Sequence, residues 1–157
     1  MARQYTAIKR QTEDAIEALI NKFKGSNLTG VTFYKGFDFS QELKTPRLEI
    51  VAAKAVPEIV GPEVTGNWIV DLSATIVSYY KDTTRAAHEL RIGVIEDVFM
   101  RSDVSELVNN LSSVKNFTIF SGVYGWRPGD GLDTTDGKEF KSMYDVTIKC
   151  APRVFSQ

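Results

Sequence analysis

The residues best suited to nucleophilic chemistry are the single histidine, His88, and the single cysteine, Cys150. A cysteine attacks as its thiolate, and a histidine within hydrogen-bonding reach is a common base for it. Cys150 falls among the apolar members of an alternating pattern, which predicts a buried and inert thiol. His88 falls in an apolar stripe of a predicted helix, which favours a packed or interface histidine. A catalytic Cys–His pair is therefore the less favoured interpretation, and the sequence assigns no catalytic residue.

Residues 129–137 have the composition of a cation-binding loop. Three aspartates recur there at every third position, in Gly-Asp-Gly-Leu-Asp-Thr-Thr-Asp-Gly. Calcium prefers such oxygen ligands, but an EF-hand loop needs alternate ligand positions and a distal glutamate. An ordinary loop is the favoured interpretation, with a bound cation as the alternative. One histidine and one cysteine are too few for a zinc site, and no glycine-rich nucleotide motif occurs. We predict no metal or cofactor site.

Arg91 is the third residue that needs a special environment. It projects between two apolar stripes of the predicted helix that carries His88. A charge in that position needs an ionic partner or a path for its head group to reach water. Two interpretations remain open: the side chain extends to solvent, or it forms a salt bridge across a subunit boundary.

The element that positions His88 and Arg91 is a helix predicted from Thr83 to Met100, capped by Asp82 or Thr83. One apolar stripe of this helix is expected to cover the sheet, and the other to meet the N-terminal helix or another subunit. The first stripe comprises Ala87, Leu90, Val94 and Val98, and the second comprises His88, Ile92, Ile95 and Phe99. A shorter helix is predicted over Ser102–Leu111.

The N-terminal segment Tyr5–Lys24 is predicted to be an amphipathic helix, ended by Gly25. Its apolar arc comprises Tyr5, Ile8, Ala15, Ile16, Leu19 and Phe23. The polar side chains, expected in solvent, are Lys9, Arg10, Glu13, Asp14, Glu17, Asn21 and Lys22.

Five segments have the pattern of β-strands. The strongest is Trp68–Tyr80, in which Trp68, Val70, Leu72, Ala74 and Ile76 share one face, and we expect it at the centre of the sheet. The others are Val31–Tyr34, Arg47–Val56, Phe117–Tyr124 and Glu139–Ala151, of which the last two are predicted to pair as a hairpin. The alanines of Arg47–Val56 also allow a helix there. Residues 35–46, 57–66 and 126–138 are rich in glycine, proline or polar residues and are interpreted as connections.

These elements predict one α+β domain over residues 1–157, with a mixed or mostly antiparallel β-sheet covered by the N-terminal and central helices. The chain has 43% hydrophobic and 25% charged residues, as soluble globular proteins do. Its 19 Lys and Arg balance 20 Asp and Glu, so no bulk charge attracts nucleic acid. Neither a secretory signal nor a membrane span is expected, and one cysteine fits a reducing compartment.

In sequence order, these features resemble the tail terminator and tail completion (neck) proteins of long-tailed bacteriophages. The resemblance rests on the amphipathic helix Tyr5–Lys24, the strand Gly66-Asn67-Trp68-Ile69-Val70, and Asp82-Thr83-Thr84-Arg85-Ala86-Ala87-His88 opening a helix. It continues in the aromatic strand near residue 120, the Gly/Asp loop and the closing strand Tyr144-Asp145-Val146-Thr147-Ile148-Lys149-Cys150. It covers most of the chain, from Tyr5 to Pro152, but includes no functional motif that could be carried over residue by residue.

The resemblance implies a virion structural protein, assembled in the host cytoplasm and located in the tail or neck. Such a subunit forms a homo-oligomeric ring, typically a hexamer, at the head-proximal end of the tail tube. The ring contacts the tail tube protein, ends tube polymerisation and joins the tail to head–tail connector or neck proteins. DNA passes through its lumen without specific binding, and the protein is neither an enzyme nor a cofactor carrier. The alternatives are another neck, head-completion or tail-tube protein, and less favourably a small enzyme or ligand-binding domain.

Overall fold

The computed structural model of the chain describes residues 3–4, 7–36, 43–79, 83–100, 114–128, 139–152 and 155–156. Within them the order is β1 (Arg3–Gln4), α1 (Ile8–Phe23), β2 (Thr32–Lys35), β3 (Arg47–Val60), β4 (Glu63–Tyr79), α2 (Arg85–Met100), β5 (Val114–Pro128), β6 (Glu139–Pro152) and β7 (Phe155–Ser156). The predicted helix over Ser102–Leu111 and the cation-loop candidate at residues 129–137 lie outside the described residues.

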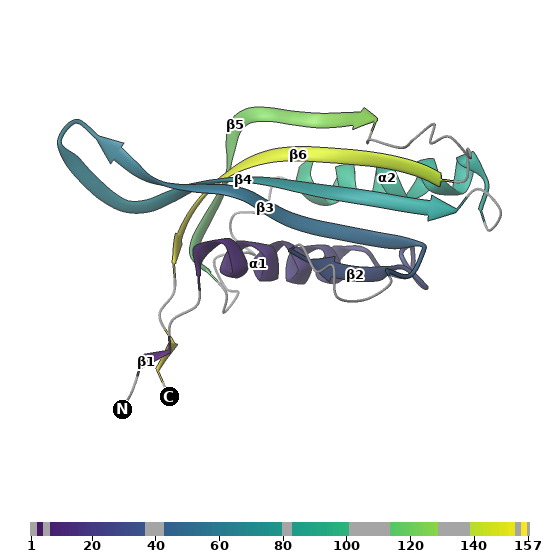
Figure 1. Cartoon of the computed structure of the whole chain (residues 1–157), viewed down its shortest axis with the longest axis horizontal. Helices are drawn as coiled ribbons and strands as arrows, with labels where there is room; N and C mark the ends of the chain where they lie inside the picture. Colours follow the sequence, from purple (N-terminus) through teal and green to yellow (C-terminus); the bar gives the residue numbers. More distant parts are fainter. Residues whose placement is uncertain are drawn as a thin grey trace.

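The described strands β2 to β6 form one five-stranded sheet in the order β2-β3-β4-β6-β5 (Figure 1). β2 runs parallel to β3 and every other neighbouring pair is antiparallel, so the sheet is mixed and the predicted α+β class is confirmed. The strand that contains Trp68 is the middle one, as expected. β1 and β7 pair separately and bring the two ends of the chain together.

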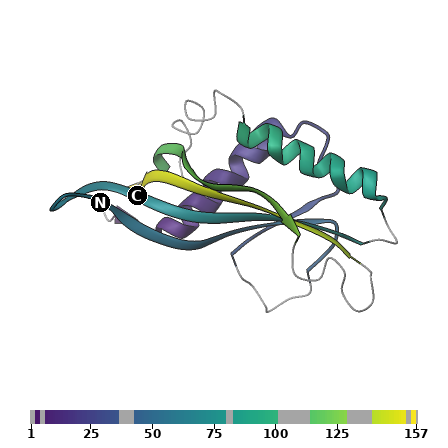
Figure 2. The same ribbon diagram turned by 90° about the horizontal axis from the view of Figure 1, so that it is seen from above.

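Both helices cover the same face of the sheet (Figure 2). Strand register explains why this face is apolar: Leu72 of β4 lies between Ala52 of β3 and Val146 of β6, and Ala74 lies between Ile50 and Tyr144. Each alternate residue of three adjacent strands thus points at the helices. The buried core residues on this face are Leu48, Ile50, Ala52, Val70, Leu72, Ala74, Ile76, Tyr144, Val146, Ile148 and Cys150. The other face carries no helix among the described elements.

The stretch predicted as a connection, residues 57–66, is instead the end of a long β-hairpin. β3 continues to Val60 and β4 begins at Glu63, so the two strands pair almost to the turn. Gly61 has φ of 61°, the positive value that a two-residue hairpin turn needs at its first central position. Pro57 is tolerated because β2 pairs only with Arg47–Ile50, which leaves this part of β3 at the sheet edge.

The hairpin projects well beyond the helix-covered sheet (Figure 1). We call residues Val56–Asn67 the arm. The prediction for residues 57–66 was wrong: their glycines and prolines were interpreted as marking a connection, but these residues continue β3 and β4 around a tight turn.

The helices differ from their predictions in detail. α1 begins at Ile8 rather than Tyr5, and it buries Glu13, which was expected in solvent. α2 is capped by Thr84, whose Oγ1 accepts the N–H of Ala87 at 3.2 Å, rather than by Asp82 or Thr83. The stripe containing Leu90 was expected to cover the sheet, yet Leu90 is 60% exposed. The buried residues of α2 are His88, Ile95, Val98 and Phe99.

Candidate functional site

The two predicted nucleophile candidates do not meet. Nε2 of His88 lies 3.1 Å from Oγ of Ser142. Ser142 precedes Cys150 by eight residues along β6, or about 26 Å at the usual rise of a strand. The Sγ of Cys150 instead lies 3.6 Å from Oγ1 of Thr12, and burial raises the pKa of this thiol. Cys150 is buried, as predicted, and its inertness stays a prediction.

His88 is the centre of a polar cluster between α2 and the sheet. The residue is only 3% exposed, and each ring nitrogen lies 3.1 Å from a serine hydroxyl, Nδ1 from Ser78 of β4 and Nε2 from Ser142 of β6. The ring of Phe140 stacks on the imidazole with centroids 5.5 Å apart. Arg91 Nη1 donates a hydrogen bond to the same Ser78 oxygen at 2.8 Å. We call these five residues the His88 cluster.

The hydrogens in this cluster determine what His88 can do. Ser78 already accepts the N–H of Arg91, so its own O–H is available to donate to Nδ1 of the neutral imidazole. We therefore assign the proton to Nε2, which then donates to Ser142. In that tautomer His88 does not accept the Ser142 proton, and a guanidinium stands where a triad has a carboxylate. The geometry is that of a packing contact rather than of a nucleophile and its base.

The electrostatics agree with a neutral His88. Burial is the main cause that lowers the pKa of the imidazole, the charge of Arg91 lowers it further, and Glu89 acts in the opposite direction. Burial also lowers the pKa of Arg91. Arg91 is partly exposed, which fits the interpretation that its side chain extends toward solvent, and its Nη1 donates to Ser78 within the same chain. The salt bridge across a subunit boundary stays a prediction. The expectation of a packed histidine is confirmed.

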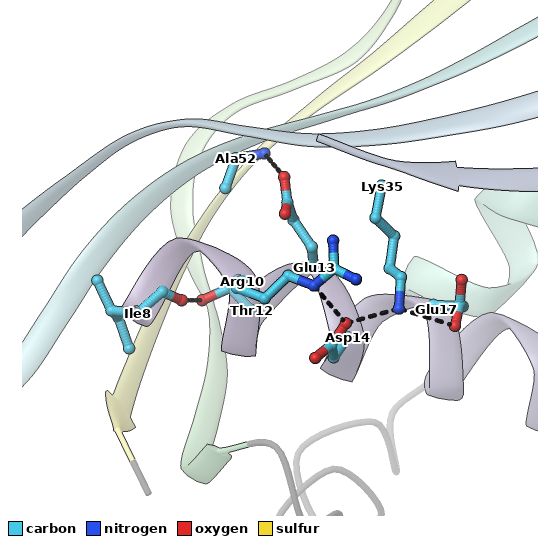
Figure 3. A network of polar contacts seen from close by, with 8 residues as sticks. All are labelled: Ile8, Arg10, Thr12, Glu13, Asp14, Glu17, Lys35 and Ala52. Atoms are coloured by element: carbon cyan, nitrogen blue, oxygen red, sulfur yellow. Dashed lines mark hydrogen bonds and ion pairs between the residues drawn. The ribbon is translucent and has the colours of Figure 1, made fainter. Parts of the chain in front are cut away.

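A second polar contact attaches α1 to the sheet (Figure 3). Oε2 of Glu13 accepts the backbone N–H of Ala52 in β3 at 2.9 Å. β3 shifts register against β4 between Ala52 and Lys54, so Ala53 is left out of the ladder. Lys9 of α1 donates to the carbonyl oxygen of Ala53 at 3.0 Å. The helix therefore binds the backbone groups of an irregularity in the strand.

The exposed side of α1 is joined to β2 by ion pairs (Figure 3). Lys35 Nζ lies 2.7 Å from Oδ1 of Asp14 and 3.3 Å from Oε1 of Glu17, and Arg10 shares the Asp14 carboxylate at 3.4 Å. Glu13 is 5% exposed, and burial raises its pKa although the N–H of Ala52 lowers it. Glu13 is thus a buried carboxylate held by one backbone amide.

The helix-free face of the sheet carries two adjoining shallow cavities of about 330 and 300 Å³ that share Ala53 and Ser73. The two carboxylates in the first are already engaged: Ser73 donates to Asp145 at 2.6 Å, and Thr147 donates to Asp71 at 3.0 Å. In the described part of the chain no three His, Cys, Asp or Glu side chains gather as a metal site would require. This face offers hydroxyl–carboxylate pairs rather than a cofactor cradle.

The arm carries the largest group of exposed apolar side chains among the described residues. Its aliphatic side chains are largely in solvent: Val56 is 37%, Ile59 62%, Val60 63% and Val64 68% exposed. A two-stranded ribbon with apolar faces is only marginally stable in water unless something packs on it. Large exposed apolar side chains on a protein surface mark interaction sites when they gather in one place.

Polar contacts hold the base of the arm in position. Glu58 accepts hydrogen bonds from Thr65 at 3.0 Å and Asn67 at 3.1 Å, and forms an ion pair of 2.7 Å with Lys149 of β6. These bonds lower the pKa of Glu58, with that of Lys149 the largest. The arm is therefore oriented by the domain, while its apolar side chains remain uncovered.

α2, which lies toward the opposite end of the molecule from the arm tip, carries two exposed apolar side chains (Figure 1). Leu90 is 60% and Met100 64% exposed. Gly93 lies between them in sequence, and a Cβ built on it would meet nothing within 4 Å. The sequence predicted a broad apolar arc on this helix but did not show which part of it stays uncovered in the single chain.

The arm and the two serines of the His88 cluster were missed by sequence reasoning. For the arm a signal existed, because Gly61-Pro62 separates two runs rich in β-branched residues, a hairpin pattern. For Ser78 and Ser142 no local signal exists, since they meet only through strand pairing.

No helix within the described residues combines the length and hydropathy that a bilayer crossing requires. Compared with known proteins, the chain matches no family model and no curated protein sequence.

Proposed function

We propose that the protein is a virion structural protein, a tail terminator that forms a ring at the head-proximal end of a phage tail tube. The observation that carries the proposal is the exposed apolar arm at one end of the subunit, together with the exposed side chains Leu90 and Met100 on α2, which lies toward the other end. Two different surfaces that bind each other join subunits head to tail, and such contacts close into a ring when the rotation allows.

The arm fits this role physically. Ile59, Val60 and Val64 would leave water on contact with the next copy, and each buried aliphatic side chain of this size contributes about 1.5–3 kcal/mol. The arm is already extended and its base is held by Glu58, so little chain entropy is lost on binding.

In the assembled state the ring, a hexamer by the resemblance, would bind the tail tube protein on one side and head–tail connector or neck proteins on the other. DNA would pass through its lumen without specific binding. A neck, head-completion or tail-tube subunit could use the same arm, so the form of the assembly separates these alternatives.

The test is negative-stain electron microscopy of the purified protein, combined with light scattering, alone and with tail tube protein. Rings that cap short tubes support the terminator role, and long tubes formed by this protein alone support a tube role instead. The arm variant Ile59→Ser/Val64→Ser should stay monomeric, whereas Glu63→Gln, which keeps the aliphatic side chains, should assemble like the wild type.

A species that stays monomeric at its highest soluble concentration and does not bind tube protein would overturn the proposal. Assembly that is unaffected by the arm variant would exclude the arm as the contact, while leaving a ring possible through other surfaces.

A further inference from the structure

α2 is attached to the sheet in two chemically different ways along its length. In its second half Ile95, Val98 and Phe99 are buried at 0%, 0% and 4% exposure, and the Phe99 ring stacks on Tyr144 with centroids 5.0 Å apart. In its first half, from Arg85 to Ile92, His88 is the one buried side chain, and all of these residues are described. The first half is thus held by the hydrogen bonds of the His88 cluster, and the second by apolar packing.

A glycine separates the two halves. Gly93 is in the middle of α2, and glycine weakens a helix interior because its unfolded backbone has more freedom than that of alanine. No neighbouring side chain requires a glycine there, since a Cβ would have open space around it. Gly93 is therefore the position at which we expect α2 to loosen first, and it precedes the packed Ile95.

Protonation would weaken the cluster because it places a second positive charge beside Ser78. In the tautomer assigned above, the neutral imidazole accepts from Ser78 and donates to Ser142. An imidazolium donates from both nitrogens. Ser78 would then face two cationic donors, His88 and Arg91, at one buried oxygen.

Few other charges surround the imidazole to offset this. Among the described residues, the charged groups that act on it are Arg91 and Glu89, both from α2, and Glu89 is already paired with Arg85 at 3.1 Å. β4 contributes the hydroxyl of Ser78, and β6 contributes the hydroxyl of Ser142 and the ring of Phe140. The only described charge adjacent in β6, Lys141, lines a cavity on the opposite face of the sheet.

We infer that the first half of α2 is an acid-sensitive latch: protonation of His88 releases Arg85–Ile92 from Ser78 and Ser142, while Ile95, Val98 and Phe99 keep the rest of the helix docked. The release would uncover the end of the sheet and displace Leu90. This inference rests on the His88 cluster and does not depend on the proposed assembly role.

The first test uses the wild-type protein, because its single histidine gives one unambiguous imidazole signal in nuclear magnetic resonance. At pH 7.5 the ring nitrogens should show the Nε2–H tautomer. Hydrogen exchange, corrected for the intrinsic effect of pH, should then be compared at pH 7.5 and 5.5. Backbone amides of residues 85–92 should exchange several-fold faster at the lower pH, while those of residues 95–100 change little.

Variants assign the effect to His88. His88→Gln cannot gain a proton and should show no acid-induced increase in residues 85–92. Glu13→Gln removes the buried carboxylate of α1, away from the His88 cluster, and should keep the increase. Gly93→Ala should reduce it, because alanine stiffens the helix between its two halves.

Equal exchange changes in both halves of α2, or an unchanged acid response in His88→Gln, would overturn the latch. If His88→Gln does not fold, the wild-type titration decides: an imidazole that is charged at pH 7.5, or that protonates without faster exchange in residues 85–92, also overturns it.

Discussion

The two helices lie on the same face of one sheet, yet they are held there differently. α1 buries Ala15, Ile16, Leu19 and Ile20 along its length, and its buried carboxylate, Glu13, binds a backbone amide of β3. α2 buries apolar residues in its second half, and the ring nitrogens of its buried imidazole, His88, contact two side-chain hydroxyls. A serine side chain can rotate out of a hydrogen bond, whereas a backbone amide within a strand cannot. The docking of α1 is therefore a fixed part of the fold, whereas the docking of the first half of α2 depends on the protonation state of His88.

The largest expected effects come from the apolar anchor of each helix. Ile16→Ala in α1 and Ile95→Ala in α2 should each lower the free energy of unfolding by about 2–5 kcal/mol, because both side chains are fully buried. Leu90→Ala is the matched control, and it should change the free energy by no more than about 0.5 kcal/mol. Urea denaturation measures all three, and an equal cost for Leu90→Ala would show that α2 packs through its predicted stripe after all.

The next largest effect tests the hydrogen bond between Glu13 of α1 and the backbone N–H of Ala52 in β3. Glu13→Ala leaves the buried N–H of Ala52 without its acceptor and should cost about 1–3 kcal/mol. Glu13→Gln keeps an acceptor oxygen and should cost much less. If both variants lose the same stability in urea, the hydrogen bond to β3 is not what holds this part of α1.

The two buried ionisable groups should produce opposite pH dependences. The pKa of Glu13 is raised above its ordinary 4.5 in the folded protein. Its contribution to the free energy of unfolding is therefore fully present below pH 4.5 and is lost as the pH rises through the folded-state pKa. The pKa of His88 is lowered below 6.5, so its contribution is present above that pH and is lost as the pH falls toward the folded-state pKa.

Chemical denaturation at a series of pH values between 4 and 8 checks both signs. Glu13→Gln should flatten the decline in stability above pH 4.5, and His88→Gln should flatten the decline below pH 6.5. If a variant leaves its part of the stability–pH profile unchanged, the substituted residue does not cause the pH dependence attributed to it.

The smallest expected effect on stability is in the arm. Ile59→Ser should change the free energy of unfolding by no more than about 0.5 kcal/mol, because its side chain is 62% exposed in the single chain. Thermal unfolding of the monomer measures this. A loss of more than about 2 kcal/mol would mean that the arm packs on its own domain and is not a free surface.

Much of the fold was predictable because its elements have strong local patterns. The alternation from Trp68 to Ile76 identified the central strand, and the helical spacing around Ile16 identified α1. The ends of the elements were predicted less well, because Pro57 and Gly61 have the same signature in a loop and in a hairpin at a sheet edge. The burial of Glu13 was not predictable, because a carboxylate in a polar stripe gives no sign that an amide of Ala52 will face it.

The sequence by itself determined the α+β class, the central strand, the burial of Cys150 and the packed nature of His88. These features follow from the periodic spacing of apolar residues, a pattern that is formed by residues close together in the chain. Only the tertiary structure decided that Ser78, Ser142 and Arg91 meet at His88, that Glu13 reaches the irregularity in β3, and that residues 57–66 project as an arm. The physical reason is that strand register and helix docking join residues far apart in sequence, and no local pattern specifies those contacts.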